Sequence, residues 1–160
     1  MKIDTIYIDM DGVIADFSKR YKEKFRVTPE ETRNDKEFNG YFDKFIDDEE
    51  FITLDLMPDA DELLHFVSQI DVPKEILSST ARPKNHEMIA PQKQKWLNTH
   101  KIDYKANFVP GKSLKYKYAT PNSIIIDDTK SVIEDWNKAG GIGILHRDAK
   151  STIAILKMYM

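Results

Sequence analysis

Short apolar runs alternate along the chain with longer segments whose apolar residues recur at helical spacing. Five runs are bounded by polar residues, Gly or Pro, which is typical of short buried strands. They are Ile3 to Ile8, Glu75 to Leu77, Asn107 to Val109, Ser123 to Ile126 and Ile142 to Leu145. Helical spacing is clear from Asp59 to Ile70 and again after Asp128, where Gly140-Gly141 ends the pattern.

Strands that alternate with helices of this length need crossover connections between neighbouring strands. The pattern therefore predicts the α/β class, with a mainly parallel five-stranded sheet covered by helices on both faces. Over sixty residues separate the first two predicted strands, which is more than one crossover helix requires. We expect a small helical cap over residues 18–56, inserted into a core formed by residues 1–17 and 57–160. The helices of this cap are expected near Phe17 to Phe25, Pro29 to Asn34 and Tyr41 to Asp47.

Composition narrows the classes of function. The 160 residues suit one main domain, and 41% apolar with 32% charged residues is typical of a globular protein. A net charge of −3 argues against a basic surface that binds a nucleic-acid polymer. The absence of cysteine excludes disulfides, thiolate zinc sites and cysteine nucleophiles. Early acidic residues and the lack of a long apolar run lead us to expect a cytoplasmic protein with no membrane anchor.

The strongest local signal for chemistry follows the first predicted strand. There Asp9 and Asp11 stand one residue apart, and Gly12 allows the backbone to turn and approach a ligand closely. Two nearby carboxylates repel each other, and Mg²⁺ with its preference for oxygen ligands would relieve that repulsion. The plainer alternative is that both acids only cap the following helix.

A second acidic pair, Asp127-Asp128, follows another predicted strand. Parallel strands place their carboxyl ends at one edge of the sheet, so Asp9 can share a magnesium ion with Asp127 or Asp128. One of the two residues in the second pair could instead cap the helix from Lys130 to Lys138.

Hydroxyl residues follow the second predicted strand, and basic residues follow the third. Ser78, Ser79 and nearby N–H groups are candidates to bind a phosphate, with Arg82 adding a charged contact. A lysine near the carboxylates would neutralise phosphate, and the candidates are Lys112, Lys115 and Lys117. The pattern does not choose between these lysines, and each could equally belong to a solvated basic face.

These elements, in this order, make the chain resemble the haloacid dehalogenase (HAD) superfamily of phosphohydrolases. The resemblance extends from Ile3 to Leu145 and rests on Asp9-Met10-Asp11-Gly12-Val13, Leu77-Ser78-Ser79 and Ile126-Asp127-Asp128. Within that superfamily the chain is similar to the 5'(3')-deoxyribonucleotidases, which carry a small helical cap at the same place. It departs from them at Pro58-Asp59-Ala60, where the family often has Pro-Gly-Ala. The resemblance implies a Rossmann-like three-layer core.

The resemblance also implies a role for each site residue. Asp9 would attack phosphorus and form an aspartyl-phosphate, and Asp11 would act as general acid and then general base. Mg²⁺ would be held by the Asp9 carboxylate, the Asp11 main-chain carbonyl and Asp127, with Asp128 nearby. Ser78, Ser79 and one lysine, Lys112 or Lys115, would bind the phosphoryl oxygens.

The expected substrate is a small phosphate monoester, and the subfamily resemblance favours a nucleoside monophosphate. Phe17 and Phe45 resemble aromatic side chains that stack on a nucleobase, although both could simply pack the cap onto the core. Two rival hypotheses remain. One is a phosphatase for sugars or other small metabolites, and the other is a non-enzymatic phosphoacceptor switch. Oligomeric state is left open by the sequence.

Overall fold

The computed structural model describes residues 2–33 and 36–160, and its five strands form one sheet in the order β3-β2-β1-β4-β5. Every neighbouring pair is parallel, which confirms the α/β prediction and extends it from mainly to entirely parallel. The strands are β1 (Thr5–Ile8), β2 (Lys74–Ser79), β3 (Lys105–Val109), β4 (Ser123–Asp127) and β5 (Ile142–Leu145).

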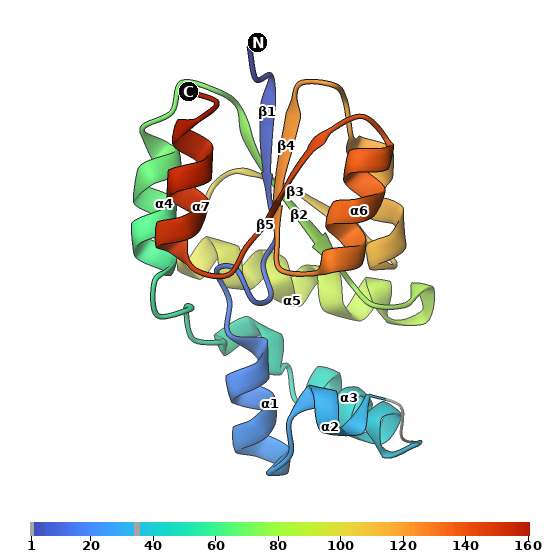
Figure 1. The fold of residues 1–160 in the computed structure, drawn as a ribbon. Coiled ribbons are helices and arrows are strands. Elements are labelled where there is room, and N and C mark those ends of the chain that lie inside the picture. Colours follow the sequence, from blue (N-terminus) through green and yellow to red (C-terminus); the bar gives the residue numbers. More distant parts are fainter. Residues whose placement is uncertain (1, 34–35) are drawn as a thin grey trace.

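Two helical layers cover the sheet, as the right-handed crossovers of parallel strands require (Figure 1). Side chains alternate along β1, so Ile6 and Ile8 enter the larger apolar cluster on one face and Tyr7 packs against the other cluster. Helices α4, α5 and α7 contribute to the larger cluster, and α6 with the 3₁₀ helix η3 forms the opposite layer. Their bounds are α4 (Ala60–Ser68), α5 (His86–Thr99), η3 (Lys112–Tyr118), α6 (Lys130–Lys138) and α7 (Ala149–Lys157).

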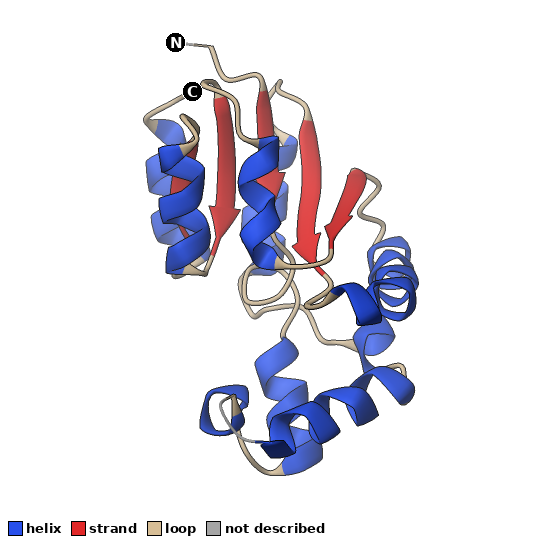
Figure 2. Cartoon of the chain, turned by 90° about the vertical axis from the view of Figure 1, so that its right-hand side faces the viewer, coloured by secondary structure: helices blue, strands red, loops and turns tan. Residues whose placement is uncertain are grey.

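Between β1 and α4 the chain forms a separate group of helices beyond the carboxyl ends of the strands. Figure 2 shows the strand arrows pointing toward this group. It consists of α1 (Phe17–Phe25), α2 (Pro29–Thr32), α3 (Lys36–Asp47) and the 3₁₀ helix η1 (Glu50–Thr53). Helix α3 begins before the expected Tyr41, and Asn34, the expected end of the second helix, lies outside the described residues.

Two connections hold the helical group against the core. The two crossing segments pair through an isolated bridge between Ala15 and Leu56. Helix α5 adds two buried side-chain hydrogen bonds to carbonyl oxygens of the helical group: Trp96 Nε1 donates to Leu54 at 2.7 Å, and Gln92 Nε2 donates to Ile46 at 2.9 Å. These contacts fix the position of the helices over the edge of the sheet.

Two core helices were not predicted from the sequence. Helix α5 contains Pro91, which has no backbone N–H and interrupts the usual helical pattern, and α7 follows a short polar turn. Within the described part of the chain, no helix combines the length and the apolar character needed to span a membrane.

Candidate active site

The carboxyl ends of β1 and β4 bring three carboxylates together. Asp9 follows β1, Asp127 ends β4, and one side-chain oxygen from each of these residues and from Asp128 lies within 4.8 Å of the others. The strand register explains why these acids meet. Ile8 of β1 pairs with Ile126 of β4, so the next residue of each strand, Asp9 and Asp127, lies beside the other. Asp9 and Asp127 are 6% and 0% exposed, so their charges are shielded from water.

Lys115 supplies a positive charge between two of these acids. Its Nζ donates to Asp9 Oδ1 at 2.9 Å and to Asp127 Oδ2 at 2.7 Å. Burial alone would lower the pKa of this ammonium, but the two carboxylates outweigh it and raise the pKa. Lys115 is therefore charged, and it is the lysine of η3 that the fold brings to the acids.

Lys115 does not fully balance the negative charge of the acidic pair at the end of β4. Burial, together with repulsion from Asp9, raises the pKa of Asp127 to about 6 and that of Asp128 to about 7. Asp128 also lies against Gly12, whose φ of +82° suits glycine, and a Cβ at that position would overlap the Asp128 carboxylate. The tight turn after β1 thus depends on a residue without a side chain.

Asp11 is paired with a lysine that the sequence analysis did not identify. Lys93, on α5 and only 2% exposed, donates from Nζ to Asp11 Oδ2 at 3.0 Å, to Ser78 Oγ at 2.7 Å and to the Ser79 carbonyl at 2.8 Å. Burial and the charge of Asp9 raise the pKa of Asp11, and Lys93 opposes that rise. A sequence signal did exist, because Lys93 shares the buried stripe of α5 with Ile89, Trp96 and Leu97.

These residues fit a hard divalent cation. The cluster offers carboxylate oxygens alone, which suits Mg²⁺, and the raised pKa values mark negative charge that Lys115 does not fully balance. The second oxygen of Asp11, Oδ1, is buried without a hydrogen-bond partner among the described residues. That oxygen is available to a group bound beside Asp9.

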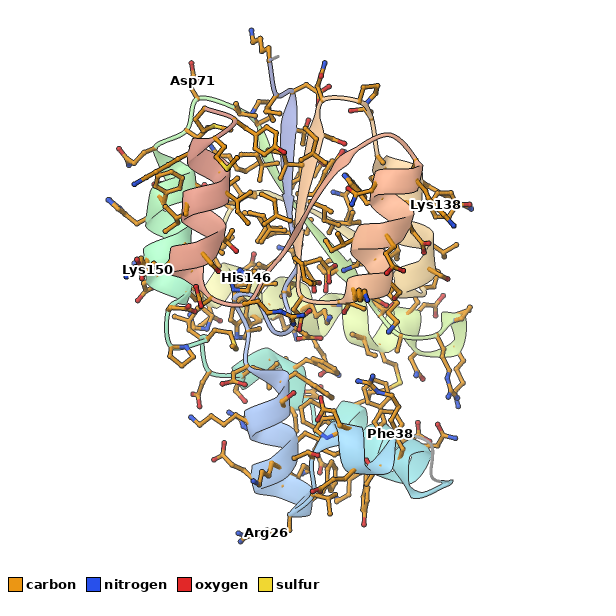
Figure 3. All side chains as sticks on the ribbon, viewed as in Figure 1. Arg26, Phe38, Asp71, Lys138, His146 and Lys150 are labelled. Atoms are coloured by element: carbon orange, nitrogen blue, oxygen red, sulfur yellow. The ribbon has the colours of Figure 1, made fainter. Side chains whose placement is uncertain are left out.

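A cavity of about 370 Å³ opens from the carboxylates toward the helical group. Ser79 and Lys112 line it, whereas Ser78 is fully buried beneath Lys93. Lys112 is exposed and lies at the start of η3, away from the ion pairs that Lys115 makes. The cavity is lined on its other side by aromatic rings of the helical group: Phe17, Phe38, Phe42 and Phe51. Figure 3 shows Phe38 in that group, below the edge of the sheet.

Phe45 is not where the sequence analysis expected it. It is 0% exposed, does not line the cavity and packs edge-on against Phe17 and Phe51 at centroid distances of 5.0 Å. Its helix turns it inward, while Phe38 and Phe42 on the same helix reach the cavity. Phe45 therefore does not reach the cavity, whereas Phe42 lines it.

No protein-family model matches the chain, and no curated protein matches its sequence. Solved structures do match its fold. A hydrolase from Streptococcus pneumoniae TIGR4 is 16% identical with a TM-score of 0.59, covering 98% of this chain and 100% of that one. A protein from Thermotoga maritima provisionally assigned as a β-phosphoglucomutase is 15% identical with a TM-score of 0.61, covering 99% and 100%.

A third similar structure is the provisionally assigned HAD hydrolase YfnB from Bacillus subtilis, bound to magnesium. It is 14% identical with a TM-score of 0.56, and the match covers 98% of this chain and 99% of that one. At these identities the likeness concerns the fold alone. The chain therefore has the fold of HAD-superfamily hydrolases, over nearly its whole length.

Proposed function

We propose that this protein is a Mg²⁺-dependent phosphomonoesterase whose substrate is a nucleoside monophosphate. One observation carries the proposal: carboxylates from two separate strands converge beside two buried lysines at the end of a cavity. Paired acids with cations aimed at the same point suit the transfer of a phosphoryl group, because the reaction needs a nucleophile, a proton donor and charge stabilisation.

In the first step an Asp9 oxygen attacks phosphorus, and the bond between phosphorus and the ester oxygen breaks. Asp11 gives its proton to the departing alkoxide. The raised pKa of Asp11 favours the protonated form that this step requires. Lys93, which contacts Asp11, and Lys115, which contacts Asp9, stabilise the negative charge of the phosphoryl oxygens.

In the second step Asp11 takes a proton from water, and the resulting nucleophile attacks phosphorus of the aspartyl-phosphate. Inorganic phosphate leaves and Asp9 is restored. Asp9, Asp127 and Asp128, with the Asp11 main-chain carbonyl that the family resemblance implies, would hold Mg²⁺. When bound, Mg²⁺ would supply positive charge to the phosphoryl oxygens.

The aromatic wall of the cavity supports a substrate with a planar base. Phe42 and Phe51 present rings next to the site, and base stacking on an aromatic ring contributes about 1 to 3 kcal/mol. We propose that the helices between β1 and α4 act as the cap that selects the substrate, and that residues 18–56 form this cap.

A sugar phosphate is the second candidate. The fold likeness to the protein assigned as a β-phosphoglucomutase supports it, and the cavity also offers polar side chains such as Asn39 and Asp43. A panel of monophosphates with and without a base separates the two candidates. Equal rates for both groups would contradict a nucleotidase.

Substitution of the proposed nucleophile tests the chemistry. In Mg²⁺, the Asp9→Asn variant should hydrolyse p-nitrophenyl phosphate at least about a thousandfold more slowly than the wild type, because an amide cannot attack phosphorus. Steady-state phosphate release measures the effect. The matched control is Asp71→Asn, an exposed acid at the opposite end of the core (Figure 3).

Undiminished turnover in Asp9→Asn would refute the nucleophile, and loss in both variants would indicate an effect on folding instead. A phospho-adduct on the wild-type chain that persists for minutes, without release of phosphate, would favour the phosphoacceptor switch.

A further inference from the structure

The proposed catalytic steps do not use three cations at the mouth of the cavity. Arg82 and Lys84 follow β2, Lys112 follows β3, and all three side chains line the cavity and are exposed. Among the described residues none of them forms an ion pair with an acid. The opposite, cap side of the cavity is lined by two acids, Glu30 and Asp43, and by one further exposed cation, Arg33. No ion pair within residues 2–33 and 36–160 joins these two acids to the three cations.

The loops that follow β2 and β3 lie next to each other. Strands β2 and β3 are neighbours, so Arg82 and Lys112 leave the same edge of the sheet side by side. Ala81 has a φ of +71°, a conformation that few residues other than glycine adopt, and its carbonyl lies 3.7 Å from the position of a Cβ at Gly111. Within the loop after β2, Arg82 N donates a backbone hydrogen bond to the Thr80 carbonyl at 3.0 Å.

The three cations at the mouth differ from the catalytic end of the cavity in how their charge is balanced. There the Lys93 and Lys115 ammoniums face four carboxylates, and one divalent cation would balance the difference. The three cations at the mouth add positive charge that no ion pair offsets in the described part of the chain. Lysine and arginine side chains that lie together outside any ion pair are suited to bind a phosphate group.

We propose that the cavity binds substrates with two phosphates: one at the catalytic carboxylates and a second, unreactive one at Arg82, Lys84 and Lys112. This inference rests on the proposed phosphomonoesterase function and refines its substrate: a bisphosphate, with one reactive and one unreactive phosphate, is bound in preference to the monophosphate. The group at the mouth is a binding subsite only. The phosphate bound there is not cleaved.

Equilibrium binding tests the subsite without relying on turnover. In an Asp9→Asn background with Mg²⁺, calorimetry compares adenosine 3',5'-bisphosphate with 5'-AMP, and fructose 1,6-bisphosphate with fructose 6-phosphate. At least one bisphosphate should bind about tenfold more tightly than its monophosphate. The pair that shows the preference distinguishes a nucleoside from a sugar as the scaffold.

Adding Arg82→Gln and Lys84→Gln should reduce this preference to within about twofold. The matched control adds Lys138→Gln and Lys150→Gln, exposed lysines of α6 and α7 that do not line the cavity (Figure 3), and should keep it. Equal affinity for mono- and bisphosphates, or a preference that survives removal of Arg82 and Lys84, would overturn the subsite. Failure of the proposed function is a different result, namely wild-type protein that hydrolyses no phosphomonoester.

Discussion

Lys93 and Lys115 are both buried lysines, yet they face different carboxylates. Lys115 joins the acids at the ends of two strands, whereas Lys93 bridges Asp11 to the end of β2. A buried ammonium with three acceptors holds its position firmly, because each lost hydrogen bond would leave a desolvated charge. Lys93 thus fixes the side chain that we propose donates and accepts the proton.

Replacing Lys93 with Met should lower kcat/KM for a phosphate monoester by about a hundredfold, comparable to the loss of one charge-stabilising donor. Because Lys93 lowers the pKa of Asp11, its removal should also shift the pH optimum upward. The pH profile of kcat/KM checks both effects.

Lys95→Met is the control, since Lys95 lies on the same helix but is exposed. An unchanged pH optimum in Lys93→Met would mean that Lys93 does not control the proton on Asp11.

At the scale of elements, α5 connects the core to the helical group between β1 and α4. It packs on the larger apolar cluster while its Trp96 and Gln92 bind carbonyls of the helical group. The same helix carries Lys93, so one element contributes to the proposed catalytic end and also supports the wall of the cavity. A change in its packing is therefore expected to affect both stability and substrate binding.

Trp96→Phe should destabilise the protein by about 1 to 3 kcal/mol, because the buried Leu54 carbonyl loses its partner. Trp136→Phe is the matched comparison: that indole is also fully buried, but its hydrogen bond to the Ser123 carbonyl is longer, at 3.3 Å. Urea unfolding of both variants gives the two free energies. A smaller loss for Trp96→Phe than for Trp136→Phe would contradict the expected role of this bond.

At the scale of the whole molecule, the acidic cluster couples folding to pH and, if the proposed function holds, to Mg²⁺ as well. Asp128 has its pKa raised to about 7 by burial and by Asp9, so the folded state binds a proton that the unfolded chain releases near pH 4. The contribution of Asp128 to the free energy of unfolding therefore increases as the pH falls below about 7, and it is lost as the pH rises above that value. A bound divalent cation would stabilise the folded state most at higher pH, where the carboxylates are ionised.

Without Mg²⁺, the Asp128→Asn variant should be more stable than the wild type at pH 8, and this advantage should shrink by about 1 kcal/mol, or roughly 2 to 4 °C in Tm, by pH 6. Comparing the two proteins cancels the contribution of His146, whose pKa is lowered by burial and which acts in the opposite direction over this range. Thermal unfolding in EDTA at both pH values measures the difference. A constant Tm difference between pH 6 and pH 8 would contradict the raised pKa of Asp128.

Addition of Mg²⁺ should raise the Tm of the wild type at pH 8 and have a much smaller effect on Asp128→Asn. An equal increase in both proteins would mean that Asp128 does not contribute to the cation site.

Local patterns in the sequence determined much of the fold. Apolar runs ending in Asp9 and Asp127 predicted two strands with acids at one edge, because a strand's residues and the turn after it are neighbours in the chain. The long interval after the first strand likewise indicated the inserted helices. Helix α5 was missed because Pro91 and its polar residues obscure the helical pattern.

Only the tertiary structure decided which distant side chains meet. Lys115 instead of Lys112 reaches the acids, Lys93 reaches Asp11 across 82 positions, and Phe45 turns inward while Phe42 lines the cavity. Residue spacing cannot fix such contacts, because they depend on how crossover helices rotate and pack against the sheet. The packing of the whole core determines which face of each helix points toward the site.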